Sequence, residues 1–348
     1  MTRFKTLAFA AISSVALAAC GGGSSGASRD AAWAVGSSTL YPFAAAVAEE
    51  VAKGGVKAPK VEQNGSGAGI KMFCEGVGAK FPDIANASRR IKKSEFETCQ
   101  KNGVKDIAEI QVGLDGIAFA EGKSGPGIAL TPVDVYKALA ANPFGKPNTA
   151  KTWKDVNPAL PALPILVYGP PTTSGTRDAL AELILAKGCD SDPAMKALKA
   201  LKDKDADAHK KVCTEVREDG AYVDSGEEDN LIVQKLAENP NAIGVFGFSF
   251  LEENMDKLKG ITMAGVEPTY ASISDFSYPG ARPLYIYVKM AHLNAVPGLK
   301  EFVAAWAKVW GADGLLKSKG MVISPDDVRA KNAVIAANPV AMDASTLK

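Results

Sequence analysis

The chain has 348 residues, of which 47% are hydrophobic and 23% are charged, and this is the composition of a globular protein with room for two lobes. It excludes an intrinsically disordered, collagen-like or coiled-coil protein. The formal net charge is +1, so bulk charge indicates no surface for nucleic acid or another polyanion. Any anion chemistry must therefore come from a few placed residues.

The N-terminal segment 1–19 is predicted to be a secretory signal peptide. Two cations precede an apolar run over 7–19 that is too short to span a bilayer as a mature helix. The run ends in Leu-Ala-Ala-Cys20, which resembles a bacterial lipobox and predicts lipidation of Cys20, unless this is merely a cysteine near a cleavage site. Residues 20–28, rich in Gly and Ser, are predicted to form a flexible tether. We expect the remainder to be periplasmic and lipid-anchored, in the inner or the outer membrane.

Short strand-like runs alternate with helical patterns along the rest of the chain, which predicts an α/β architecture with mainly parallel sheets. In chain order, strand-like runs over 33–35, 60–63, 83–87 and 163–168 each lead into a polar turn and then a helical pattern. After the third run, Ser94 and Glu97 have the spacing of a capping box and predict a helix start there.

Besides Cys20, the chain has four cysteines, an even number in a compartment that permits disulfides, with three possible connectivities. We predict local pairing, Cys74 with Cys99 and Cys189 with Cys213. Shorter loops cost less entropy to close, and each pair then lies within one lobe. Four buried free thiols are the alternative.

The polar turns are candidate anion sites. The first N–H groups of a helix have no partner inside it, and the helix dipole places partial positive charge at that end. Serine and threonine hydroxyls add donors, and the guanidinium groups of Arg89 and Arg177 match tetrahedral oxyanions with two parallel bonds. One such turn is usually only a helix cap, but four in one chain favour convergence on one crevice at the carboxyl ends of the strands.

Four motifs carry a resemblance to a known family. They are 36–42 (Gly-Ser-Ser-Thr-Leu-Tyr-Pro), 64–69 (Asn-Gly-Ser-Gly-Ala-Gly), 83–89 (Asp-Ile-Ala-Asn-Ala-Ser-Arg) and 174–178 (Ser-Gly-Thr-Arg-Asp). As a set, and in this order, they resemble the phosphate-binding protein of the high-affinity phosphate ABC transporter. The resemblance implies a type II periplasmic binding protein, two α/β lobes joined by two crossing strands, that closes on inorganic phosphate and passes it to an inner-membrane permease. We expect a monomer.

When the binding residues of the family are assigned to the matching motifs of this chain, the resemblance implies phosphate donors on all four turns. The expected binding residues are Ser38, Thr39, Leu40, Ser66, Ser88, Arg89, Ser174, Gly175, Thr176 and Arg177.

The sequence departs from the family at Arg89, because well-known members have there an aspartate that accepts the proton of hydrogen phosphate. A donor thus stands in place of an acceptor. Asp178 or Asp229 could supply an acceptor, or could orient Arg177, and we favour orientation because buried guanidinium groups need paired acceptors.

The lobe boundaries follow from the two expected crossing strands, an outgoing one over 111–120 and a returning one over 282–288. Lobe I is then predicted to comprise 29–115 plus 286–348, and lobe II 116–285, within several residues.

An enzyme is the main alternative class. A serine hydrolase is disfavoured because no Gly-x-Ser-x-Gly elbow precedes a credible acid and histidine. A phosphohydrolase needs paired metal ligands, and His209 and His292 are poorly placed for them, so we expect no metal, no cofactor and no catalysis. A lipoprotein of this family with a role in adhesion or secretion control stays open as a further alternative.

Overall fold

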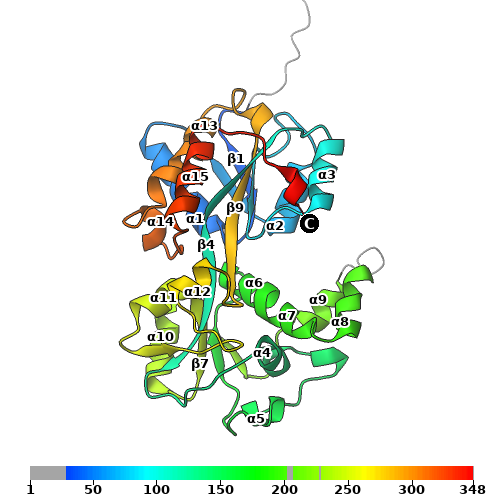
Figure 1. Ribbon diagram of the computed structural model, residues 1–348, viewed down its shortest axis with the longest axis vertical. Helices are drawn as coiled ribbons and strands as arrows, with labels where there is room; N and C mark the ends of the chain where they lie inside the picture. The colour runs from blue at the N-terminus through cyan, green and yellow to red at the C-terminus, as the bar shows by residue number, and fades with distance from the viewer. Residues whose placement is uncertain (1–28, 202–206, 227–228, 348) are drawn as a thin grey trace, which may run out of the picture.

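Two long strands join two lobes in the computed structural model, which describes residues 29–201, 207–226 and 229–347. Strand β4 (Ile107–Gly122) passes from one lobe into the other, and β9 (Ala281–Lys289) lies antiparallel beside it (Figure 1). They contain the predicted crossing strands. The type II binding-protein architecture expected from the sequence is thus observed.

Lobe I is a sheet with helices on both faces (Figure 1). Besides β4 and β9, its elements are β1 (Trp33–Gly36), β2 (Lys60–Gln63), β3 (Ile84–Ala87), α1 (Tyr41–Lys53), α2 (Ser66–Phe73), α3 (Lys93–Lys101), α13 (Leu299–Val309), α14 (Leu315–Ser318) and α15 (Asp326–Ala337). Successive strand residues point to opposite faces. Ile84 therefore packs with α1 and α13, while Ala85 packs with α2 and α3.

Lobe II has one large hydrophobic core around the C-terminal half of β4. Its strands are β5 (Val167–Gly169), β6 (Tyr222–Asp224), β7 (Ile243–Gly247) and β8 (Leu258–Gly260). Its helices are α4 (Pro132–Leu139), α5 (Trp153–Val156), α6 (Gly175–Ala179), α7 (Ala186–Cys189), α8 (Pro193–Ala197), α9 (Ala208–Cys213), α10 (Asp229–Glu238), α11 (Phe248–Glu253) and α12 (Tyr270–Ser274). A π-helical segment, η2 (Leu180–Leu185), joins α6 to α7 without a break.

The strands have the order β2-β1-β3-β9-β4-β7-β5-β6, with β8 on β4. The prediction of mainly parallel sheets is correct for the strands that lead into the polar turns, since β1 pairs in parallel with β2 and β3, and β5 with β6 and β7. It is wrong around β4 and β9, whose pairings are antiparallel. A strand that leaves a lobe and a strand that returns to it must run in opposite directions.

The pairing partner of β4 changes near the predicted lobe boundary. Residues Ile107–Gly116 pair with β9, and Ile117–Ala120 pair with β7. The division into 29–115 plus 286–348 and 116–285 stays a prediction.

Two local predictions are corrected. The fourth strand is only β5, Val167–Gly169, rather than 163–168. Helix α3 begins at Lys93, and Glu95 rather than Glu97 reaches back, accepting the Lys92 N–H at 2.9 Å. The helix therefore starts before Ser94, and the predicted capping box is wrong.

Both predicted disulfides are present, Cys74–Cys99 and Cys189–Cys213, each closing a short stretch of chain within one lobe. Cys20 lies outside the described residues. Within the described ranges, no helix is long and apolar enough to cross a membrane.

Candidate functional site

The three polar turns of lobe I meet at the carboxyl end of its parallel strands. The Gly65 N–H donates to the carbonyl of Gly36 at 2.9 Å, which joins the turns after β2 and β1. The Ser88 N–H donates to Ser66 Oγ at 3.0 Å, which joins the turn after β3 to the start of α2. Both serines are buried, Ser66 at 9% and Ser88 at 4% exposure, so their polar atoms form a shared, buried cluster.

The backbone at Gly36 approaches the backbone of β3 closely, and only glycine permits this. Its φ is +133°, and a Cβ there would lie 2.2 Å from the carbonyl oxygen of Asn86. The backbone of β1 can therefore turn directly against β3 only without a side chain.

The first turn, which follows β1, is buried and internally bonded. The Leu40 N–H donates to Ser37 Oγ at 3.4 Å, and the Leu40 side chain packs in the lobe I core. Thr39 is 8% exposed and lies at the base of the gap between the lobes. The turn thus presents Thr39 to lobe II and holds Leu40 inward.

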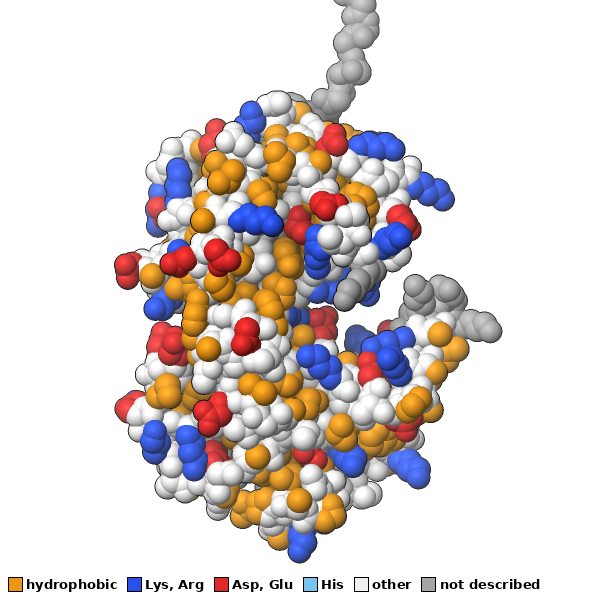
Figure 2. Space-filling view, in the orientation of Figure 1, with side chains coloured by type: hydrophobic (Ala, Val, Ile, Leu, Met, Phe, Trp, Pro, Cys, Tyr) orange, Lys and Arg blue, Asp and Glu red, His pale blue; other side chains and the backbone are white. Residues whose placement is uncertain are grey.

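The lobe II turn begins the continuous helical run from α6 through η2 to α7. Ser174 caps this run by accepting the Thr176 N–H on its Oγ at 3.2 Å. The surface is hollowed between the lobes on the side of α6 to α9, and Lys and Arg side chains lie on both rims (Figure 2). Both turns also line a cavity of about 440 Å³ that reaches α11 and the end of α14. Its lining residues include Ser38, Thr39, Ser174, Gly175, Thr176, Gln63, Asp115, Phe250 and Lys319.

The two lobes touch directly at Thr39 and Gly175. Thr39 Oγ1 donates to the Gly175 carbonyl at 3.2 Å, and a Cβ at Gly175 would lie 2.4 Å from Thr39 Cα. Asp178, one turn along α6, interacts with Ser38 across the same gap. Burial raises the pKa of Asp178, and the interaction with Ser38 only partly opposes this.

Arg89 is held by an acid on its own lobe. Its two terminal nitrogens donate to the two carboxylate oxygens of Glu95 at 2.9 and 2.7 Å. Burial opposes ionisation of Glu95, but the bonds from Arg89 and the Lys92 backbone outweigh it and lower the pKa of Glu95. Arg89 Nη2 lies 3.8 Å from where a Cβ of Gly67 would be, so the guanidinium stands beside the first turn of α2.

Arg177 does not line the cavity beside Thr39. Its guanidinium stacks on the ring of Tyr222 at 4.3 Å, beside a second cavity of about 240 Å³. Burial raises the pKa of Tyr222 to about 12, and its hydroxyl donates to the Pro170 carbonyl at 2.6 Å. Consecutive helix residues point in different directions. Asp178 interacts with Ser38, and its expected role in orienting Arg177 stays a prediction.

The remaining expected acceptor, Asp229, begins α10, but its side chain lies outside the described part of the structure.

Sequence reasoning missed two charged residues of the crossing strands. Asp115 lines the cavity beside Thr39, and Arg282 donates to it from Nε at 2.9 Å. Burial raises the pKa of Asp115, and Arg282 opposes this. The available signal was the presence of ionisable residues inside strands that are mostly apolar, because a buried charge requires a partner.

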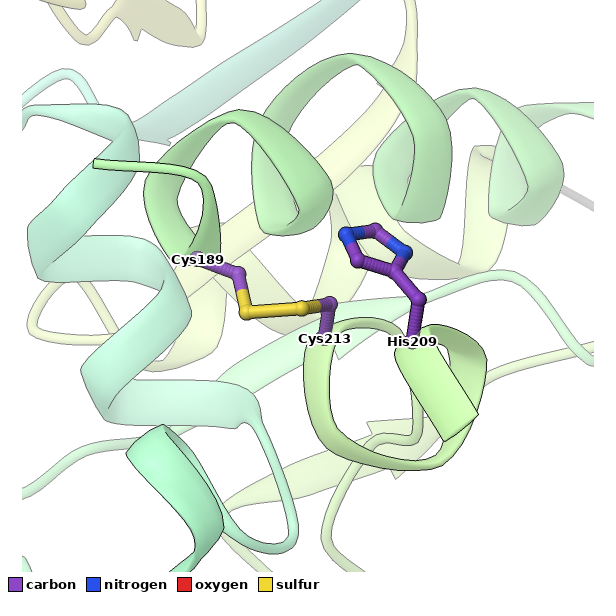
Figure 3. A group of neighbouring side chains, drawn as sticks. All are labelled: Cys189, His209 and Cys213. Atoms are coloured by element: carbon purple, nitrogen blue, oxygen red, sulfur yellow. A yellow bond between two sulfur atoms is a disulfide. The ribbon is translucent and has the colours of Figure 1, made fainter. Parts of the chain in front are cut away.

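One group of described residues has the composition of a metal site but not its chemistry. Ligand atoms of Cys189, His209 and Cys213 lie within 4.8 Å of one another. Figure 3 shows the two sulfurs joined as a disulfide beside the His209 imidazole, so they offer no thiolate. His209 Nε2 lies 2.8 Å from Asp190 Oδ1. This group stabilises the helical arm α7 to α9.

Comparisons with known proteins agree with this architecture. A family model described as a PBP superfamily domain matches residues 23–308. Protein SphX of Synechococcus elongatus is 35% identical over 272 residues, which are 75% of this chain and 69% of the relative. The phosphate-binding protein PstS of Staphylococcus saprophyticus is 32% identical over 300 residues, which are 83% of this chain and 81% of the relative.

Among solved structures, a possible phosphate binding protein from Planctomyces limnophilus has a TM-score of 0.69 at 26% identity, with 88% of this chain and 98% of that chain covered. The chain therefore belongs to the PBP superfamily and, within it, to the family of the PstS phosphate-binding proteins.

Proposed function

We propose that this protein binds inorganic phosphate between its two lobes and delivers it to an inner-membrane ABC permease. The main support is the contact of Thr39 with Gly175, which places a donor-rich turn of one lobe against a donor-rich turn of the other. Family membership supports phosphate as the anion.

The proposed donors share burial or a position at a helix start, which makes an anion the natural ligand. Their N–H groups and hydroxyls act in a low-dielectric environment where each bond to an anion counts more than in water. The proposed set is Ser38, Thr39, Leu40, Ser66, Ser88, Arg89, Ser174, Gly175, Thr176 and Arg177. Leu40 and Arg177 require rearrangement to take part, because the Leu40 N–H bonds Ser37 and Arg177 lies on Tyr222.

We propose that the protein is not an enzyme, and the positions of its two histidines support this. A serine hydrolase needs a histidine beside the nucleophile. His292 is buried in lobe I, where its Nδ1 lies 2.6 Å from Asp83 Oδ1 and its Nε2 accepts the Gly78 N–H. His209 pairs with Asp190 in the arm of lobe II. Neither His292 nor His209 therefore serves as a general base for the cluster of buried hydroxyls.

The signal pattern supports a periplasmic protein anchored by lipid on Cys20, and we propose that it acts as a monomer. Mass spectrometry of the N-terminal peptide from membranes tests the anchor. An unmodified Cys20, or cleavage elsewhere, contradicts it.

Calorimetry on the mature chain tests phosphate binding, after unfolding and refolding to strip carried-over ligand. We expect one site, and a loss of about 1 to 3 kcal/mol in binding free energy for Ser66→Ala. Ser318→Ala is the matched control, because Ser318 is exposed at the end of α14. Absence of heat and of a thermal shift with phosphate would refute the function.

Competition by sulfate and arsenate from pH 6 to 8 tests how the anion is recognised. Because donors predominate in the proposed set, we expect phosphate affinity to hold or rise as phosphate loses its second proton within this pH range. Affinity that falls over this range, together with strong rejection of sulfate, would instead indicate a carboxylate that accepts the ligand proton. Asp178 is then the first candidate and Asp229 the second.

A further inference from the structure

Arg282 makes an unusual set of bonds for a residue of a crossing strand. The side chain is only 5% exposed, and each of its three nitrogens donates to a different residue. Nε donates to Asp115 Oδ2 at 2.9 Å, Nη1 to Glu182 Oε2 at 2.6 Å and Nη2 to Thr39 Oγ1 at 2.8 Å. A single guanidinium therefore connects three separate parts of the fold.

The three acceptors lie on different parts of the fold, namely a crossing strand and both lobes. Asp115 lies on β4, directly opposite Arg282 in the strand register. Thr39 precedes α1 in lobe I, and Glu182 lies in η2 of lobe II. A buried guanidinium is costly unless its N–H groups are paired. Separation of the lobes removes one or both outer acceptors, so these bonds favour the lobe arrangement in which all three are present.

The bond to Thr39 also determines where the threonine proton points. A hydroxyl has one proton and can accept through its oxygen lone pairs. Arg282 donates to Thr39 Oγ1, and the hydroxyl proton is directed to the Gly175 carbonyl at 3.2 Å. Arg282 thus acts on the contact between the two turns through Thr39.

We propose that Arg282 is a positioning residue that holds the two lobes together over the bound anion, acting through Thr39. This rests on the proposed function for its ligand, but the lobe contact itself does not. The charge of Arg282 is matched by Asp115 and Glu182, so its role is to stabilise the closed arrangement. Because closure follows the first encounter, loss of this role appears in the rate of ligand release.

Stopped-flow kinetics with phosphate on the mature chain tests the proposal. Arg282→Lys keeps a charge beside Asp115, but a compact ammonium cannot span acceptors that the guanidinium reaches from three separate nitrogens. We expect release to accelerate at least about tenfold, a difference of about 1.4 kcal/mol, with association changed less than about threefold. Arg217→Lys is the matched control, since Arg217 is buried at 8% exposure and bonds Asp219 and two carbonyls inside lobe II.

A double-variant cycle separates positioning from a general structural role. If Arg282 acts through the hydroxyl of Thr39, Arg282→Lys adds little further acceleration in the Thr39→Val background and regains its effect in Thr39→Ser. Fully multiplicative effects in Thr39→Val, or release from Arg282→Lys within twofold of the wild-type rate, would overturn the proposal.

Small-angle scattering without phosphate makes the test independent of the ligand. We expect a larger radius of gyration for Arg282→Lys than for the wild type, and the wild-type radius for Arg217→Lys. Equal radii for Arg282→Lys and the wild type would overturn the proposal. A wild type that does not bind phosphate would refute the proposed function alone, because this comparison of radii still decides the role of Arg282.

Discussion

Gly175 is the most direct place to test that the two turns meet when the protein binds its ligand. A Cβ at this position would lie 2.4 Å from Thr39 Cα and 2.7 Å from Thr39 N, both backbone atoms. Carbon atoms in contact prefer separations of about 3.5 to 4.0 Å. Gly175→Ala therefore requires the turns to part by about 1 Å or more.

The cost follows from the bonds that this shift disrupts. The bond from Thr39 Oγ1 to the Gly175 carbonyl is already 3.2 Å long, and parting of the turns would break it and displace donors of both turns. A hydrogen bond to a charged group contributes about 1.5 to 3 kcal/mol. We therefore expect phosphate affinity to fall about 10- to 150-fold. Each lobe should keep its stability, because alanine suits a helix better than glycine.

Calorimetric titration with phosphate measures the affinity, and thermal unfolding without phosphate reports the stability of the lobes. Gly247→Ala is the matched control, because Gly247 lines the same cavity, a Cβ added there would have no atom within 4 Å, and its φ is an ordinary −61°. An affinity of Gly175→Ala within twofold of the wild type would refute the reasoning, since Thr39 and Gly175 could not then be in contact in the complex.

Three further predictions concern stability. Burial raises the pKa of Asp178, so the stability that its neutral carboxyl contributes is present below the usual pKa of 3.8 and is lost as pH rises through the raised pKa. Asp178→Asn should therefore raise the unfolding temperature at pH 7, and a lower unfolding temperature would contradict this. Burial lowers the pKa of Lys289 to about 8, so unfolding calorimetry should show wild-type stability rising relative to Lys289→Met between pH 8 and 10.5, and parallel profiles would disprove it. Replacement of Cys74 and Cys99 by alanine should cost about 3.5 kcal/mol in denaturant unfolding, from the entropy of the 25-residue loop, and a cost below about 1 kcal/mol would argue against that origin.

Local patterns in the sequence were sufficient for much of the fold. The strand-like runs at 33–35 and 60–63 became β1 and β2, because alternation and turn residues act over a few neighbours. The disulfide pairing followed from loop entropy, which depends on sequence separation. The meeting of the turns after β1, β2 and β3 was predictable because parallel strands place their carboxyl ends on one edge.

The partners of the charged residues depended on tertiary structure. The sequence by itself placed Arg89 and Arg177 in polar turns, but the start of α3 gives Glu95 to Arg89, and the packing of β6 beside β5 gives Tyr222 to Arg177. Arg282 acquires its role from the contact of two lobes about the crossing strands, and strand patterns do not encode that contact. Residue types and local order determine where donors lie along the chain, whereas long-range packing decides which acceptor each donor meets.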